Sequence, residues 1–194
     1  MVAYRGNPPF EQKVFRQYVK KNAEGREGTQ LSSFCTGTHN GTHCDGPIHA
    51  GLKKGVEDWP LELFYGECKV IEVRGQKEIG EKIVSSLPLF AGDRVLFKTD
   101  NSFSKDLLND FAHITLSGAK MLVQKKVALV GIDSLAVQKS GSVTQQVHQT
   151  LLSKMPVIEG LRLAKVPAGK YVLSAFPLSL QGDAALLRAV LIKE

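Results

Sequence analysis

The sequence has 194 residues, of which 23% are charged and 43% are apolar, the composition of an ordinary globular protein. No apolar run approaches the roughly 18 residues of a membrane span, the N-terminus shows no secretory signal, and three cysteines cannot close a disulfide framework. These features exclude membrane, collagen-like, disulfide-stapled and wholly disordered proteins, and they predict a cytoplasmic location. The net charge of +6 invites a nucleic-acid partner, but the basic residues form scattered pairs without interleaved aromatics, which favours a solvated surface.

Strand signals are spread along the whole chain. The predicted strands cover residues 14–20, 31–35, 68–73, 94–98, 127–132, 170–180 and 186–193, and glycine-rich loops are expected at 24–28 and 37–51. Apolar periodicity predicts helices over 117–126 and 143–154, and a weaker one over 77–85. Ser142 is the expected N-cap of the second helix, which should end before Pro156. Because strands outnumber helices without strict alternation, we predict one α/β domain over 1–194, with a mixed sheet and flanking helices.

Three of the five histidines fall between positions 39 and 49. Within this segment His43 and Asp45 are two residues apart, so in an extended strand their side chains leave the same face with Cα atoms roughly 6.5 Å apart. Imidazole nitrogen and carboxylate oxygen are ligands that Zn, Mn or Fe sites use, and this spacing lets both reach one metal ion. Cys44 points the other way and is a poor ligand candidate.

Turn signals bring the other two histidines of the segment toward this pair. Asn40 and Gly41 form a strong tight-turn dipeptide, which can fold His39 back toward the pair. Gly46 and Pro47 bend the chain again and bring His49 near the same point. A polar loop with incidental histidines is the alternative, but so dense a cluster favours metal binding.

Two residues near the C-terminus could close the site. On the second predicted helix, His148 shares a stripe with Leu151 and Leu152, so it should face the core, where a satisfied core histidine is the alternative to a ligand. Glu159 shares a strand face with Val157, and an ionised carboxylate there is costly unless it is paired or metal-bound. A twisted surface strand would also explain Glu159, but two inward polar groups favour a common site.

The segment from His39 to His49 matches His-x-Gly-Thr-His-x-Asp-x-Pro-x-His at every fixed position. The chain therefore resembles the metal-dependent hydrolase/cyclase family that includes bacterial kynurenine formamidase and isatin hydrolase. Residues 4–9, 131–134, 177–180, 183 and 188–190 also resemble family segments. The resemblance implies a swivelling β/β/α domain with a barrel-like core, and a metal centre, often binuclear, that holds two Zn²⁺ or Mn²⁺ ions.

The resemblance also implies a role for each site residue. His39, His43 and Asp45 would bind the first metal, and Asp45 would bridge to a second. The second metal would be held by His148 and Glu159, and His49 would act as the general acid/base. The implied reaction is hydrolysis of a non-peptide amide or cyclic amide C–N bond by metal-activated water. A small-molecule amide, lactam or lactone would be the substrate, with tryptophan catabolism as one setting, and the family implies a homodimer or higher homo-oligomer.

Some features depart from the family pattern outside the ligand set. The chain begins almost at Tyr4, so the family's opening strand is expected to be short or missing. Phe10 stands near the expected position of an aryl-pocket aromatic, and Ser134 is followed by Leu135 where many members carry an acid. The alternatives to amide hydrolysis are lactone hydrolysis or cyclisation on the same metals, and a non-catalytic metal- or nucleic-acid-binding module.

Four further residues have structural interpretations. Trp59 is expected to be a core or interface aromatic, and Cys35 and Cys68 are expected to be small buried residues in strands. His113 has no partner that the sequence identifies.

Overall fold

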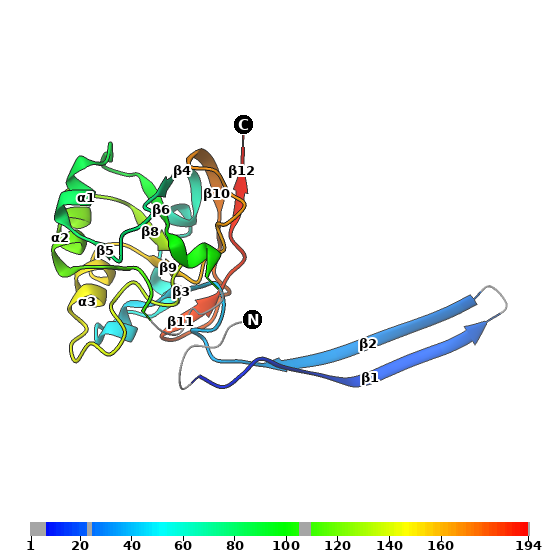
Figure 1. The fold of residues 1–194 in the computed structure, drawn as a ribbon. Helices are drawn as coiled ribbons and strands as arrows, with labels where there is room; N and C mark the ends of the chain where they lie inside the picture. Colours follow the sequence, from blue (N-terminus) through cyan, green and yellow to red (C-terminus); the bar gives the residue numbers. More distant parts are fainter. Residues whose placement is uncertain (1–6, 23–24, 105–109, 194) are drawn as a thin grey trace.

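A computed structural model gives the fold and describes residues 7–22, 25–104 and 110–193. Tyr4, Arg5 and Gly6, which belong to the early segment that resembles the family, lie outside the described residues. The body is built on an eight-stranded sheet in the order β11-β3-β9-β8-β6-β4-β10-β12 (Figure 1). The strands are β3 (His43–Asp45), β4 (Tyr65–Glu72), β6 (Arg94–Lys98), β8 (Leu129–Ile132), β9 (Val157–Glu159), β10 (Gly169–Ser174), β11 (Ala184–Leu186) and β12 (Val190–Ile192).

The sheet is parallel in its centre and antiparallel at both ends. Strands β4, β6, β8 and β9 run parallel, whereas β3 and β11 at one end and β10 and β12 at the other pair antiparallel. Both faces of the centre are buried. In β6, Val95 and Phe97 join one apolar cluster, while Leu96 joins the cluster on the opposite face. This is the arrangement expected of parallel strands that are covered on both faces.

The sheet curls so strongly that its two ends approach each other. Strands β11 and β12 occupy opposite ends of the strand order, yet only residues 187–189 separate them in the chain. The steps from Leu186 to Val190 span at most about 14 Å, since consecutive residues advance by no more than about 3.6 Å. The predicted mixed sheet with a barrel-like core in an α/β fold is therefore confirmed.

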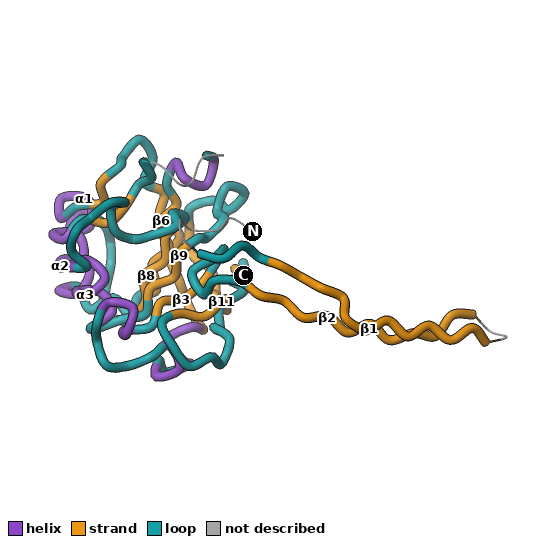
Figure 2. Tube along the Cα trace, turned by 90° about the horizontal axis from the view of Figure 1, so that it is seen from below, coloured by secondary structure: helices purple, strands orange, loops and turns teal. Residues whose placement is uncertain are grey.

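Three helices cover one face of the sheet (Figures 1 and 2). They are α1 (Glu81–Ser86), α2 (Leu116–Gln124) and α3 (Gln146–Leu152). Short 3-10 helices cover Pro47–Ala50, Val56–Asp58, Leu61–Phe64 and Asp100–Phe103, and β5 (Glu78–Ile79) pairs in parallel with β7 (His113–Ile114). No helix in the described part of the chain is long and apolar enough to cross a membrane.

A long antiparallel hairpin projects from this body (Figures 1 and 2). It consists of β1 (Glu11–Asn22) and β2 (Gly25–Cys35), which pair only with each other among the described strands. The predicted strands at 14–20 and 31–35 fall within it. The loop predicted at 24–28 is wrong from Gly25 onward, since β2 begins there. Cys35 is exposed, not buried as predicted, because the hairpin leaves the body.

Other boundaries differ from prediction for local reasons. Helix α3 begins at Gln146 with Gln145 as N-cap, and Ser142 instead donates its hydroxyl to the Lys139 carbonyl. The strand predicted at 170–180 ends at Ser174, before Pro177, which lacks the N–H that a ladder needs. The strand predicted at 186–193 is broken because the chain passes there from one end of the sheet to the other.

Candidate metal centre

Strand β3 presents two polar side chains on the helix-covered face of the sheet. It lies between β11 and β9, and His43 stands directly opposite Glu159 in the β3–β9 ladder. His43, Asp45 and Glu159 are at most 3% exposed. Cys44 points to the opposite face and packs in the other apolar cluster. The predicted alternation, with His43 and Asp45 on one face and Cys44 on the other, is confirmed.

Two glycines let the loop before β3 come close to the end of β9. Gly41, in the predicted turn, has φ of 65°, and Gly160, which follows Glu159, has φ of 68°. A Cβ at Gly160 would lie 2.1 Å from the Gly41 carbonyl oxygen, so only glycine fits there. The Thr42 hydroxyl then donates to the Gly160 carbonyl at 2.9 Å, which fixes the two segments together. This contact places His43 against Glu159.

The first group of donor atoms surrounds one oxygen of Asp45. His39 Nδ1 lies 3.1 Å from Asp45 Oδ1 and 3.2 Å from His43 Nε2. His43 Nε2 lies 3.4 Å from the same oxygen and 3.3 Å from Glu159 Oε2. The turn therefore folds His39 back onto the pair, as predicted.

The second group lies on the other side of Asp45. Nε2 of His148, on α3, is 3.8 Å from Asp45 Oδ2 and 3.4 Å from Glu159 Oε1. The two oxygens of Asp45 thus face different histidines. The backbone N–H of Val137 donates to Glu159 Oε1 at 2.6 Å, which holds that carboxylate in place. His148 is 5% exposed, and its predicted inward orientation is confirmed.

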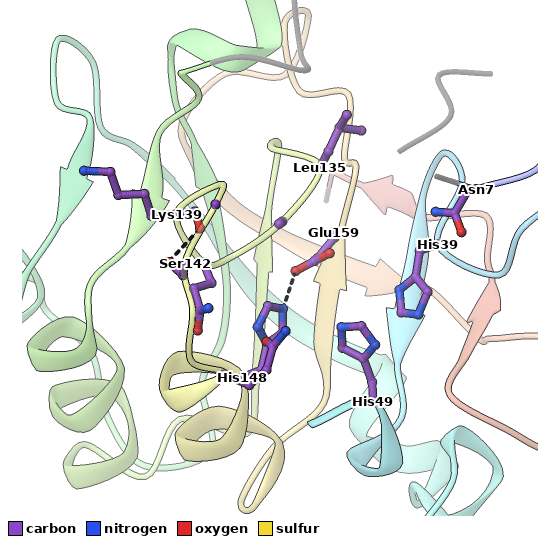
Figure 3. A pocket seen from close by; sticks show the side chains of 12 residues that line it. Asn7, His39, His49, Leu135, Lys139, Ser142, His148 and Glu159 are labelled. Atoms are coloured by element: carbon purple, nitrogen blue, oxygen red, sulfur yellow. Dashed lines mark hydrogen bonds and ion pairs between the residues drawn. The ribbon is translucent and has the colours of Figure 1, made fainter. Parts of the chain in front are cut away.

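His49 completes the cluster from the 3-10 helix that follows β3. Its ring centroid lies 4.2 Å from that of His39 and 5.1 Å from that of His148, and it faces the same cavity (Figure 3). Donor atoms of His39, Asp45 and His49 lie within 4.8 Å of one another, as do those of His43, Asp45 and Glu159. Geometry therefore makes His49 a potential ligand as well as a proton carrier.

The charges in this cluster call for a cation. Asp45 is fully buried, and neither of its oxygens accepts a hydrogen bond. Burial by itself would raise its pKa, but the adjacent His39 and His43 hold the pKa of Asp45 well below its ordinary value. A buried ionised carboxylate without hydrogen bonds is costly unless a positive charge compensates it. The orphaned oxygens and converging imidazole nitrogens fit a metal ion of the kind that uses N and O ligands.

The histidines respond to this charge in different ways. Burial lowers the pKa of His43, but its contacts with Asp45 and Glu159 outweigh burial and raise the pKa to about 10. For His49, burial dominates and lowers the pKa. His49 therefore stays neutral near pH 7 and can accept a proton, whereas His43 carries a positive charge when no metal is bound.

A cavity of about 360 Å³ opens beside the cluster (Figure 3). His39, His49, His148 and Glu159 line one side of it. The other residues that line it include Asn7, Leu135, Ala136, Gln138 and Gln145. Gln138, which the sequence did not single out, accepts from the Val147 N–H through Oε1 and so braces the start of α3. A small molecule can enter this cavity and reach the donor atoms.

The remaining sequence expectations divide between structural roles and positions away from the site. Trp59 packs partly buried against the core and donates Nε1–H to the Asp45 carbonyl at 3.0 Å, so it supports the backbone of the site. Cys68 is buried, as predicted. Phe10 is half-exposed and stacks on Phe34, outside the cavity. His113 lies near the Phe111 carbonyl, also away from the site.

Comparisons with known proteins agree with this geometry. Residues 3–139 match the family model Cyclase, described as "Putative cyclase". A kynurenine formamidase of Erythrobacter litoralis is 39% identical over 160 residues, which cover 79% of this chain and 73% of that protein. A solved structure described as a potential metal-dependent hydrolase with cyclase activity is 32% identical and superposes with a TM-score of 0.79 over 98% of this chain and 94% of its own.

A more distant structure supports the fold alone. Isatin hydrolase A from Labrenzia aggregata is 20% identical, with a TM-score of 0.80 over 98% of this chain and 86% of its own. The same curled sheet therefore recurs where most side chains differ.

Proposed function

The chain belongs to the Cyclase family, and from this membership we propose that it is a metal-dependent hydrolase of a non-peptide amide or cyclic amide C–N bond, similar to an arylformamidase. The observation that carries the proposal is Asp45, a fully buried carboxylate whose two oxygens accept no hydrogen bond and face different histidines. Such a group has the character of a bridging metal ligand, and a folding role alone would have given it hydrogen bonds.

Five residues are proposed as the ligands of two Zn²⁺ or Mn²⁺ ions. His39, His43 and Asp45 would hold the first ion, and Asp45, His148 and Glu159 the second. Bound ions of this kind polarise a carbonyl group and make water acidic enough to attack at neutral pH. The protein contributes a rigid frame, since the ligands come from paired strands, a glycine-fixed turn and the buried face of α3.

His49 is the proposed general acid/base. It lies against His39 and His148 at the edge of the cavity, and its lowered pKa keeps the imidazole neutral near pH 7. A neutral imidazole can take the proton released by the attacking water and pass it to the leaving nitrogen as the C–N bond breaks. No covalent acyl-enzyme is needed.

The cavity sets the class of substrate. Its volume of about 360 Å³ suits a small molecule and not a macromolecule, and the kynurenine formamidase relative makes an aryl formamide the first candidate. A step in tryptophan catabolism is the setting proposed for such a substrate. Isatin-like lactams and lactones present a similar carbonyl to the same metals, so lactone hydrolysis or cyclisation is the second candidate.

A substrate panel tests the proposal. Metal-stripped protein is reloaded with Zn²⁺ or Mn²⁺ and assayed on aryl formamides, isatin-like lactams and lactones, with the metal-free protein as control. We expect metal-dependent hydrolysis of at least one amide or lactam. Turnover of lactones alone would favour the second candidate, and no turnover of any class by fully loaded protein would overturn both.

We propose that the protein is active as a homodimer or higher homo-oligomer, and that it acts in the cytoplasm. The projecting hairpin supports the oligomer. A two-stranded ribbon is only marginally stable in water, and at its base Val14, Phe15 and Phe34 are more than half exposed. A second copy would cover this surface. Phe15→Lys is expected to lower the mass measured by light scattering, whereas Phe90→Lys, at an exposed site on the body, should not. Equal masses for the parent protein, Phe15→Lys and Phe90→Lys would contradict this role for the hairpin.

A further inference from the structure

Asp183 contacts the metal-binding segment from outside it. In the β11–β3 ladder Ala184 stands opposite Asp45, so Asp183 lies just beyond the pair. Its carbonyl accepts a hydrogen bond from the Gly46 N–H at 2.7 Å. Its side chain reaches the other end of the segment, where Oδ1 accepts from the Thr38 hydroxyl at 3.2 Å and Oδ2 lies 3.2 Å from His39 Nε2. Asp183 thus contacts both ends of the segment from Thr38 to Gly46.

The contact with His39 decides which ring nitrogen is free. His39 Nδ1 points at Asp45 Oδ1 and His43 Nε2, while Nε2 points at Asp183. A carboxylate has no proton to give near pH 7, so His39 Nε2 must carry the hydrogen and donate it. The lone pair of the neutral ring is then on Nδ1, which faces the proposed metal position. The geometry selects the tautomer that a ligand at this position requires.

A carboxylate that accepts a hydrogen bond from a metal-ligating histidine influences how that histidine binds the metal. An acceptor behind a ligating histidine fixes the ring orientation and raises the basicity of the ligating nitrogen. His39 needs such an anchor because it lies in a turn outside the sheet and is the most exposed of the three ligands proposed for the first metal, at 13% of its side chain. No other carboxylate is recorded next to His39 Nε2 among the described residues.

We propose that Asp183 is the positioning residue of His39, accepting the Nε2–H so that Nδ1 binds the metal held with His43 and Asp45. This inference rests on the proposed metal centre and adds a residue that lies outside the histidine-rich segment. Because Asp183 acts through His39 alone, its effect falls on the first metal and not on the one proposed for His148 and Glu159.

The alternative is that Asp183 only fastens its loop, and two control residues separate these roles. Thr38 donates to the other oxygen of the same carboxylate, so Thr38→Val removes this loop contact and leaves the Asp183–His39 contact in place. Glu57 is an acid on the neighbouring segment whose Oε2 accepts from the Gly182 N–H, so Glu57→Gln removes a charge nearby without contact to His39.

The experiment is a titration of metal-free protein with Zn²⁺ in competition with a chromophoric chelator, together with the thermal unfolding of each metal-free protein. We expect Asp183→Ala to weaken one of two binding events by about 10–100-fold, the range for a lost partner of a ligating histidine. The Zn²⁺ affinity of Asp183→Asn should lie between those of the parent and Asp183→Ala, since the amide oxygen still accepts the Nε2–H but carries no charge. Thr38→Val and Glu57→Gln should bind as the parent does.

The outcomes distinguish the two proposals. If the parent binds Zn²⁺ and Asp183→Ala binds it equally well, the positioning role is overturned and the metal centre stands. Equal weakening in Thr38→Val and Asp183→Ala would show loop fastening and would also overturn it. A parent protein that binds no Zn²⁺ would overturn the metal centre and the positioning role together.

Discussion

His43 and Glu159 face each other across β3 and β9, with His43 Nε2 at 3.3 Å from Glu159 Oε2 and both side chains buried. Residues directly opposite in an antiparallel ladder are the closest cross-strand neighbours that a sheet offers. The sheet therefore brings a ligand candidate from the beginning of the domain onto one from its end. Each prediction below depends on this juxtaposition or on the loops that surround it.

Asp45→Asn tests the proposed bridge. The substitution keeps the side-chain shape but removes the charge that faces His39, His43 and His148. We expect bound metal, measured by elemental analysis after equilibration with Zn²⁺, to fall below that of the parent and hydrolysis to be lost.

Metal-free Asp45→Asn should unfold at a lower temperature than the metal-free parent near pH 7, because the change removes the carboxylate that stabilises the charged His43. Full metal content in this variant would contradict the bridge.

His49→Ala separates proton transfer from metal binding. Loss of a positioned general acid/base lowers kcat by about 10²–10⁴-fold, and we expect an effect of that size with the metal content unchanged. His49 also lies close enough to His39 and Asp45 to be a ligand, so metal content is the deciding measurement. If the variant loses metal in proportion to activity, His49 is a ligand and the acid/base role is wrong.

Without metal, the stability of the protein should depend on pH through His43. Burial lowers the pKa of His43, but Asp45 and Glu159 outweigh burial and raise it to about 10, above an unfolded value of about 6.5. A raised pKa contributes stability that is complete below the unfolded pKa and is lost as the pH rises through the folded one. The free energy of unfolding should therefore decline from about pH 7 toward pH 10.

Urea unfolding of the metal-free protein across this range measures the decline. Asp45→Asn is the control, since it removes one of the carboxylates that stabilise the charged His43 and should flatten the curve. Zn²⁺-loaded protein should also show a flatter curve, because a metal ligand must be a neutral imidazole. A parent curve as flat as that of the variant would contradict the ion pair.

Gly160→Ala tests the close approach that places His43 beside Glu159. An L-residue in the left-handed region costs roughly 1–2 kcal/mol, and at Gly160 the new Cβ would also collide with the Gly41 carbonyl oxygen. Gly75→Ala is a matched control, since Gly75 has φ of 69° and open space around its Cβ position. Gly160→Ala should destabilise the protein more than Gly75→Ala and weaken Zn²⁺ binding, and equal destabilisation would contradict the packing constraint.

Cys44→Ala tests whether the cysteine between two ligand candidates takes part in binding. Cys44 points into the opposite apolar cluster, and burial raises the pKa of its thiol well above the ordinary value, which disfavours the thiolate that a metal would need. We expect unchanged metal content and a stability loss of about 1 kcal/mol, the low end for small core deletions. Loss of metal in this variant would show that Cys44 is a ligand.

The sequence by itself determined which side chains face inward. A period of two residues in strands placed His43 and Asp45 on one face with Cys44 on the other, and helical spacing turned His148 toward the core. The turn at Asn40 and Gly41, which the sequence predicts, brings His39 next to His43. These inferences held because they depend on backbone geometry within a few residues.

Only the tertiary structure decided which of these faces meet. Strand order and the curl that brings β11 and β12 close together determine three features of the site. They are the pairing of β3 with β9, the contact of Asp183 with His39, and the position of His49 among the donor atoms. The projection of the hairpin, which exposes Cys35, is likewise a matter of topology. Local periodicity fixes the direction of a side chain, but long-range strand pairing fixes its neighbours, because those contacts join residues whose spacing in the chain carries no signal.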